Sequence, residues 1–528
     1  MRVRSYDTLD FKLAWARVLT WARGGSLDIP DRLPFEVLYR LRGEVGIRPE
    51  RTFRSAPVGI VMSSKKSGTS RPFARLNPVD LTLYQALVDR LAPEIEAALP
   101  SRDVVMAYRQ SLGDDLSAFH GTPSRAAFHR QIAQLFGAPD TTWRFAIMTD
   151  VSGFFLQVDV DELERRLFEI SGQPDVVRDV AGVLRAWQSL GIRGLPQGVR
   201  ASAPLANAYL LPVDRFLAAR GVAYVRWMDD WVIAAHGFHE AREIQDEMER
   251  VLYENGLTLS SEKTKILRGQ TAIDENEGAK ERLARMKRSQ LQALEDMLAE
   301  AADLADYPLE IEDLPDMGEL DLEVTVSALD EQYAVLEQDD LLTGFRPLVT
   351  ELLRDLASLR HPHQLDRIPR LLERAPDLTA VATRYLASVA SVALEEVKAA
   401  FVSLLASDRF TREYEKLALC QAVLALPNEQ ASELAPSLAA WARDDASATV
   451  RARALLAWGA QSSSSDFSVA DEFWERCDPE WRIYALVAIQ AKDVDERATR
   501  YEEWGRQDGT LFQLALELAR HQIGWRKL

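Results

Sequence analysis

The sequence of 528 residues has little cysteine and no long apolar run. Its two cysteines, Cys420 and Cys477, are too few for a disulfide framework or a four-ligand zinc site. No uninterrupted apolar stretch approaches the roughly 18–20 residues that a membrane span needs. The first residues, MRVRSYDTLDFK, include no apolar segment of the kind found in secretory signals. We therefore expect a cytoplasmic protein without a membrane partner.

Basic charge is scarce in one half of the chain. The whole sequence has a net charge of −18, but residues 1–270 have a net charge of +2 and residues 271–528 one of −20. Such an acidic segment repels nucleic acid unless its acids are kept off one face. The asymmetry, together with the length, indicates at least two domains with different tasks.

Strand and helix patterns alternate through the first 270 residues. A strand–turn–strand pattern with a basic turn covers 57–77, a buried strand running into a turn lies within 144–159, and a second strand–turn–strand covers 222–236. Helical patterns cover 6–23, 79–98, 160–171, 174–190 and 201–219. This mixture predicts an α+β domain.

Helical patterns dominate the remainder. Residues 277–304 read as a long charged helix, 305–325 as an acidic linker, and the chain beyond about 345 as successive helices. A weak repeat is marked by four basic or polar residues, 35, 31 and 31 residues apart: Lys416, Arg451, Arg482 and Gln513. This period favours a solenoid that resembles HEAT-type repeats, in which these residues line one ridge or pair with acids of the next repeat. A helical bundle with coincidental alanine spacing remains the alternative.

Two acidic positions interrupt apolar strands of the first half. Asp150 ends the apolar segment 145–149, and the pair Asp229-Asp230 is followed at once by Trp231. A lone aspartate after a strand is more often a turn or a helix cap, and an Asp-Asp pair is more often a solvated turn. Buried carboxylates, however, are costly unless they are paired or bind metal. The arrangement suits two hard cations held for phosphoryl transfer.

Four segments occur in a characteristic order. They are Asp-Val-Ser-Gly-Phe-Phe at 150–155, a segment at 194–207 that opens Gly-Leu-Pro-Gln-Gly, Trp-Met-Asp-Asp at 227–230, and Gly-Leu-Thr-Leu-Ser-Ser-Glu-Lys-Thr-Lys at 256–265. Together they resemble the palm motifs of a reverse transcriptase. The resemblance covers roughly residues 1–270.

The resemblance implies a fold and a domain order. The fold class is an α+β right-hand polymerase, with fingers and palm, followed by an all-α HEAT-like solenoid. The fingers and palm occupy 1–270, a thumb-like helix and acidic linker 271–345, and the helical repeats 346–528.

The resemblance also implies catalytic residues. Asp150, Asp229 and Asp230 would hold two Mg²⁺ ions as the cofactor, with Asp230 the less direct partner. Lys263 would protonate the leaving pyrophosphate, and Lys265 is its rival for this role.

Six further residues are implied to bind substrate: Lys66, Arg71, Phe155, Gln197, Gly198 and Trp227. The first two belong to a basic hairpin that grips the triphosphate, where a guanidinium binds phosphate through two hydrogen bonds. Phe155 would exclude a 2′-hydroxyl, which makes deoxynucleotides the substrate. Gln197 and Gly198 would line the nucleotide pocket. Trp227 replaces the usual tyrosine and could stack near the primer end.

The absence of several sequence features narrows the choice among groups of reverse transcriptases. The sequence has no Cys-rich or His-rich endonuclease segment, no carboxylate cluster of an RNase H domain and no retron signature. What remains resembles the abortive-infection and defence-associated bacterial reverse transcriptases. The resemblance implies DNA synthesis from dNTPs in antiphage defence, either on an RNA template or noncoding RNA, or without a template. Priming from a protein tyrosine remains open.

Assembly and a second function class are also left open. The acidic second half favours a homo-oligomer or packing against the palm over wrapping of a duplex. The alternative function is that of a catalytically dispensable scaffold, whose repeats bind a protein or nucleic-acid partner.

Overall fold

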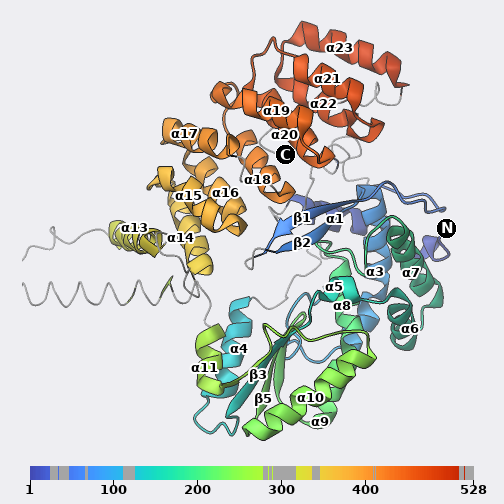
Figure 1. Ribbon diagram of the computed structural model, residues 1–528. Coiled ribbons are helices and arrows are strands. Elements are labelled where there is room, and N and C mark those ends of the chain that lie inside the picture. Colours follow the sequence, from blue (N-terminus) through green and yellow to red (C-terminus); the bar gives the residue numbers. More distant parts are fainter. Residues whose placement is uncertain are drawn as a thin grey trace, which may run out of the picture. The chain divides into compact units, whose positions relative to one another are not determined.

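The computed structural model describes residues 1–23, 34, 47–65, 69–110, 125–276, 283–284, 288, 317–335, 345–407, 410, 412–509 and 517. The chain forms two compact units. The first comprises residues 1–61 and 72–278, and the second comprises residues 62–71 and 279–528. Figure 1 shows the elements of both units. Each unit buries apolar side chains of its own.

Helices and strands alternate in the first unit. The β1–β2 hairpin is described with it, although residues 62–71 of the hairpin belong to the second unit. The elements of the first unit and the hairpin are η1 (Tyr6–Thr8), α1 (Phe11–Arg23), β1 (Gly59–Ser64), β2 (Ser70–Arg75), α3 (Pro78–Ala98), α4 (Arg125–Gly137), β3 (Phe145–Asp150), α5 (Phe154–Gln157), α6 (Val160–Ser171), α7 (Pro174–Ser189), α8 (Ser202–Tyr209), α9 (Leu211–Arg220), β4 (Tyr224–Trp227), β5 (Asp230–Ala235), α10 (Phe238–Glu254), β6 (Lys265–Arg268) and α11 (Gly269–Asn276). The expected α+β character is therefore present.

A four-stranded antiparallel sheet lies at the centre of this unit, in the order β4-β5-β3-β6. Side chains of a strand alternate between its two faces. Ile147 and Ile233 belong to the core that includes the buried side chains of α10. Ala146, Val232 and Ala234 pack with α4 and α11 on the other face. The apolar runs of β3 and β5 are thus explained by burial on both faces.

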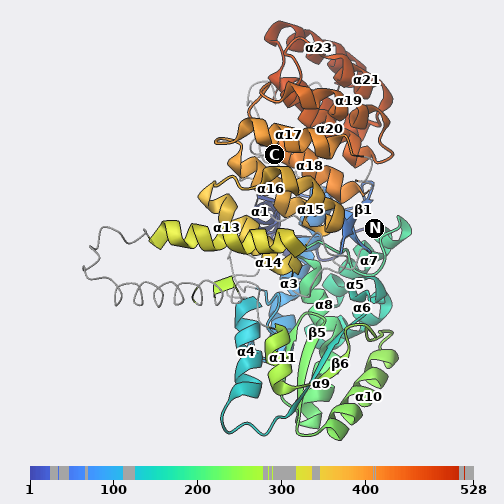
Figure 2. The same cartoon turned by 60° about the vertical axis from the view of Figure 1, so that its left-hand side comes forward.

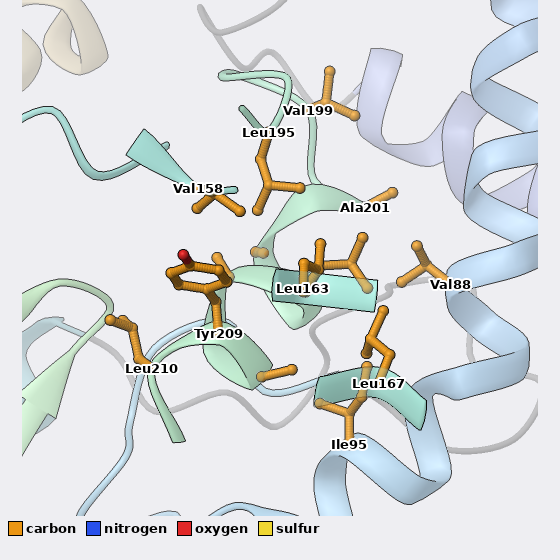
Figure 3. Packing of buried hydrophobic residues seen from close by; sticks show 14 of the residues in the cluster. Val88, Ile95, Val158, Leu163, Leu167, Leu195, Val199, Ala201, Tyr209 and Leu210 are labelled. Atoms are coloured by element: carbon orange, nitrogen blue, oxygen red, sulfur yellow. The ribbon is translucent and has the colours of Figure 1, made fainter. Parts of the chain in front are cut away.

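Helices extend the core that includes Ile147 and Ile233. Helix α3 begins at Asn77, whose side chain accepts a hydrogen bond from the backbone N–H of Val79. Most of its side chains are buried. Figure 3 shows Val88 and Ile95 of α3 beside Leu163 and Leu167 of α6. This helical layer packs in the same core as one face of the sheet.

Beyond the hairpin, the regular elements in the described residues of the second unit are all helices. Its helices are α13 (Met317–Val335), α14 (Phe345–Leu359), η4 (Leu365–Arg367), α15 (Ile368–Arg374), η5 (Pro376–Leu378), α16 (Thr379–Val389), α17 (Leu394–Leu405), α18 (Glu413–Leu424), η6 (Ser432–Leu434), α19 (Ala435–Asp444), α20 (Ala448–Gln461), α21 (Ser468–Arg476), η7 (Pro479–Trp481), α22 (Arg482–Ala488), η8 (Ile489–Ala491) and α23 (Val494–Gln507).

These helices pack in two rows. Helices α14, α16, α18, α20 and α22 contact one another in succession, while α15 contacts α17 and α19 contacts α21 (Figures 1 and 2). Contact between every second helix is what a stack of helical pairs requires. No helix in the described ranges is both long and apolar enough to cross a bilayer.

Two expectations about helices were wrong. The helix expected at 201–219 is divided at Leu210 into α8 and α9, because Pro212 has no backbone N–H to continue the hydrogen-bond ladder of α8. The linker expected at 305–325 contains the start of α13, whose Val324 and Ala328 are buried at helical spacing.

Other expectations fall outside the described residues. They are most of the long helix at 277–304, and the repeat residue Gln513.

Candidate active site

The pairing of β3 with β5 brings two of the predicted acids together. Asp150 ends β3 and lies directly opposite Asp230, the first residue of β5. Asp229 precedes it in the β4–β5 turn, where Met228 has a φ of +57°. The three acids predicted from the sequence therefore lie at one end of the sheet.

Burial and neighbouring carboxylates raise the pKa of two of the acids, Asp150 and Asp229. Burial raises the pKa of Asp150 to about 6, and the neighbouring Asp230 carboxylate acts in the same direction. Burial, with the charges of Asp150 and Asp230, raises the pKa of Asp229 to about 7. Like charges placed this closely need a counter-charge.

Lys263 supplies part of that counter-charge. Its Nζ lies 2.8 Å from Oδ2 of Asp150. Desolvation opposes the charged lysine, but the hydrogen bond to Asp150 and the nearby acids leave the pKa of Lys263 raised overall. The lysine is therefore a charged partner of the carboxylate cluster.

Backbone hydrogen bonds fix the segment that carries Lys263. The N–H of Ser152 donates to the carbonyl of Thr258 (2.9 Å), and the N–H of Ser260 donates to the carbonyl of Asp150 (2.7 Å). The rival Lys265 lies on β6, where it pairs with Glu275. Of the two lysines, the structure brings Lys263 to the acids.

The donor set fits a hard divalent cation. Carboxylate oxygens are the ligands that Mg²⁺ prefers, and a cation would relieve the repulsion that raises both pKa values. In the described part of the chain, no three His, Cys, Asp or Glu side chains are arranged closely enough to hold a metal ion as they stand. Basic side chains contact two of the acids instead: Lys263 at Asp150, and Arg125 at 3.4 Å from Asp230.

A buried ion pair supports the turn that carries Asp229. Arg226 of β4 donates from Nε and Nη2 to the carboxylate of Asp214, at 3.0 and 2.6 Å. Its Nη1 donates to Oδ1 of Asn207 (2.9 Å) and to the carbonyl of Met228 (2.7 Å). The side chains of the pair are 0% and 1% exposed. The network holds the backbone of the turn one residue before Asp229.

Sequence reasoning missed this network, although it left a signal. Arg226 stands between apolar residues of a strand, and Asp214 lies in the apolar surroundings of α9. A charge in such a position must find a partner. Each of the two residues could therefore have been identified from the sequence as a charge that needs a partner, although not which partner.

The 194–198 segment is joined to the segment that follows Asp150. The N–H of Leu195 donates to the carbonyl of Phe155 (2.8 Å). A Cβ at Gly194 would lie 2.0 Å from that carbonyl oxygen, so this close approach requires glycine. Phe155 is half-buried against the core. Two predicted substrate residues, Gln197 and Gly198, follow directly and are also half-buried.

The base of the β1–β2 hairpin contacts the same segment. The N–H of Ala74 donates to the carbonyl of Gln197 (3.0 Å). Arg71 lies on β2 and is exposed. Lys66, the other predicted triphosphate ligand, lies outside the described residues.

Aromatic and basic side chains gather beside the acids at the end of β4. The ring of Trp227 lies 5.9 Å from that of Phe128 and 6.2 Å from that of Tyr108. The Arg125 guanidinium lies over both Trp227 and Phe128, at 5.3 and 4.7 Å from the ring centres. No motif pointed to Arg125 or Tyr108, because only the fold brings them to Trp227.

The comparisons with known proteins agree with this geometry. No curated protein matches the chain. Residues 63–291 match the family model described as reverse transcriptase (RNA-dependent DNA polymerase), a range that includes the three acids and Lys263. This part of the chain is therefore similar to reverse transcriptase domains, a match that implies nucleic-acid polymerase activity.

Proposed function

We propose that the protein is a Mg²⁺-dependent DNA polymerase of reverse-transcriptase type that acts in antiphage defence. It uses dNTPs and makes DNA, either on an RNA template or without a template. The observation that carries the proposal is the cluster of Asp150, Asp229 and Asp230 at the end of the sheet, with Lys263 in contact with Asp150.

The three aspartates would hold two Mg²⁺ ions. When bound, the ions supply Lewis-acid activation of the attacking hydroxyl and neutralise charge on the phosphates. Lys263 would donate its Nζ proton to the leaving pyrophosphate. Its hydrogen bond to Asp150 and the fixed 258–264 segment support this role, since both keep the ammonium beside the reacting centre.

The remaining predicted residues would bind and select the nucleotide. Phe155 would pack under the sugar and exclude a 2′-hydroxyl, next to a pocket lined by Gln197 and Gly198. Lys66 and Arg71 would grip the triphosphate. Trp227, with Phe128 beside it, offers an aromatic surface for the primer end.

The role in defence rests on the resemblance and on the helical second unit. We propose that its two rows of helices are HEAT-like repeats, that the protein is a cytoplasmic homo-oligomer, and that a protein hydroxyl serves as primer if synthesis needs no template.

Sedimentation velocity of the purified protein would test the proposed homo-oligomer. A single monomeric species would contradict it.

Incorporation of each labelled dNTP by purified protein tests the polymerase. The product is analysed on a denaturing protein gel, with and without nuclease treatment of the protein beforehand. Product that survives the nuclease and migrates with the polypeptide indicates template-independent, protein-primed synthesis. Product that disappears with the copurified RNA indicates a templated enzyme. Absence of incorporation under every condition, with Mg²⁺ still bound, contradicts the proposal.

The alternative is a scaffold whose palm is kept for its structure. It is disfavoured because a scaffold gains nothing from three clustered acids, two of which, Asp150 and Asp229, have a raised pKa. An Asp229→Ala, Asp230→Ala variant that kept full biological activity would favour the scaffold.

A further inference from the structure

A series of ion pairs connects successive repeats of the second unit. Lys416 of α18 pairs with Asp445, the residue that directly follows α19. Arg482 of α22 pairs with Asp508, the residue that directly follows α23, at 3.5 Å. In both pairs the basic residue of one α-helix meets the acid that directly follows the next α-helix of the chain.

The pair between these two is incomplete. Arg451 of α20 occupies the basic position, but the residue that directly follows α21 is Cys477 instead of an aspartate. Within the described part of the chain Arg451 makes no ion pair. Its Nη1 donates to the backbone carbonyls of Asp445 and Ala446, at 2.6 and 3.2 Å. Its guanidinium therefore retains charge and donors that no carboxylate uses.

A cavity of about 220 Å³ lies at the incomplete pair. Its lining includes three arginines, Arg443, Arg451 and Arg476, together with Cys477 and the apolar side chain of Trp481. Arg476, in the last turn of α21, is exposed and makes no ion pair among the described residues.

Two carboxylates partly neutralise this positive charge. Arg443 is bound by Glu472 through two hydrogen bonds of 2.9 and 3.0 Å, and Asp478 also lines the cavity. Three arginines against two acids leave the lining net positive, within the half of the chain whose net charge is −20.

We propose that this cavity is an anion site that binds a terminal phosphate group, which takes the place of the aspartate missing from the middle pair. The guanidiniums of Arg451 and Arg476 would donate to the phosphate oxygens, and the Trp481 side would shield the contact from water.

The choice of phosphate rests on the proposed polymerase function, since nucleotides and nucleic-acid ends are the anions such an enzyme meets. Guanidinium groups bind phosphate through paired hydrogen bonds. The cavity is smaller than the roughly 300–1,000 Å³ of pockets that enclose a whole drug-sized ligand. It therefore suits a phosphate end whose remainder stays outside.

Cys477 gives a local readout of binding. The chain has only one other cysteine, Cys420, which is fully buried. Alkylation of Cys477 in the full-length protein by N-ethylmaleimide, an uncharged reagent, can be followed by intact mass. Inorganic phosphate, or a 5′-phosphorylated oligodeoxynucleotide, at about ten times its Kd should slow the reaction about tenfold by mass action.

Matched variants separate the cavity from general electrostatics. Arg476→Gln should abolish the protection, while Arg506→Gln, which removes an exposed arginine from the last turn of α23, should keep it. Unchanged alkylation with every probe, or equal protection in the Arg476→Gln variant, would overturn the proposal. Protection by the 5′-phosphorylated strand at far lower concentration than by inorganic phosphate, and none by the 5′-hydroxyl strand, identifies a nucleic-acid end. Equal potency of the strand and inorganic phosphate identifies a small phosphorylated ligand.

A second substitution restores the missing acid. Cys477→Asp should pair with Arg451 and prevent binding of the fluorescein-labelled 5′-phosphorylated strand at this site, whereas Cys477→Asn should permit it. Equal binding by both would count against the proposal. dNTP incorporation measured in parallel keeps the two questions apart. Protein that incorporates no dNTP but is protected from alkylation would support the anion site and contradict the polymerase function. Protein that incorporates dNTP but is not protected would contradict the anion site alone.

Discussion

At the scale of single residues, the candidate active site is a concentration of negative charge that the fold alone does not relieve. Asp150 and Asp230 face each other across two strands, where like charges are destabilising. Lys263 and Arg125 contact two of the acids, yet the pKa values of Asp150 and Asp229 remain raised. A bound cation would therefore relieve the repulsion between these carboxylates.

This imbalance predicts an unusual pH dependence of stability. The pKa of Asp229 is about 7 in the folded protein, against an ordinary value of 3.8. The folded state then holds a proton that the unfolded state has lost between pH 4 and 7, so stability falls as the pH rises through this window. In EDTA at pH 8, Asp229→Asn should raise the free energy of unfolding by about 1–2 kcal/mol, after allowance for partial solvent screening.

Urea denaturation at pH 8 and pH 4 measures this effect. The gain should largely vanish at pH 4, where Asp229 is protonated in the folded state and is close to its ordinary pKa of 3.8 in the unfolded state. Asp140→Asn, at an exposed acid, is the matched control and should show no gain at either pH. A variant less stable than the wild type at pH 8 would contradict the interpretation.

Phe155 carries the prediction on substrate choice. If its ring excludes the 2′-hydroxyl, Phe155→Ala should lower the ratio of kcat/KM for deoxynucleotides over ribonucleotides on the order of tenfold or more. Single-nucleotide incorporation with each substrate measures the ratio. Phe238→Ala, at an exposed phenylalanine of α10, serves as control. An unchanged ratio would exclude the role of Phe155 in sugar selection.

At the scale of elements, the β4–β5 turn depends on a buried ion pair. Arg226→Met would leave Asp214 without its charged partner in the core, which costs about 3–5 kcal/mol. Urea unfolding should show that loss, and Arg226→Met with Asp214→Leu should regain part of it. A single variant as stable as the wild type would mean that the network does not support the turn.

Helices α20 and α22 approach closely at Gly459. A Cβ there would lie 2.3 Å from the carbonyl oxygen of Ala488. Alanine normally stabilises a helix interior by about 1 kcal/mol relative to glycine. Here we expect the opposite: Gly459→Ala should lower the free energy of unfolding by about 1–3 kcal/mol through overpacking. A higher denaturation midpoint would contradict the close packing of the two helices.

At the scale of the whole molecule, the two halves of the chain differ in net charge. Residues 1–270 have a net charge of +2, and residues 271–528 one of −20. With so little excess positive charge, we expect few phosphate contacts. The slope of log K against log salt for a primer–template duplex, measured by fluorescence anisotropy, should therefore be shallower than about −5. A slope near −10 would show an extended basic surface that the charge distribution does not suggest.

The sequence predicted the elements that local patterns encode. The hairpin around the basic turn, helices α3, α6 and α7, and the strands that end at Asp150 and surround Asp229 all follow from apolar periodicity and turn residues. The division at Leu210 was missed because the helical pattern continues on both sides of Pro212.

Features that depend on long-range contacts could not be predicted in the same way. Lys263 and Lys265 are equivalent in spacing, and only the backbone bonds between 258–260 and 150–152 decide between them. Arg125 meets Trp227 because α4 packs on the sheet. Likewise, the repeat pattern showed Arg451 but not that its acidic partner is replaced by Cys477.

The register of β3 against β5 has a consequence for how the protein could lose activity. Side chains alternate between the two faces of a strand, so an inserted residue turns the side chains that follow it to the opposite face. One residue inserted into β5 between Ala234 and Ala235 would affect only the end of that strand. One residue inserted in the turn after Met228 would affect every side chain of β5. The second insertion would keep all three acids in the sequence and separate them in space. Intact motifs in a relative of this chain are therefore insufficient grounds to infer an active enzyme, unless the number of residues between Trp227 and Trp231 is also preserved.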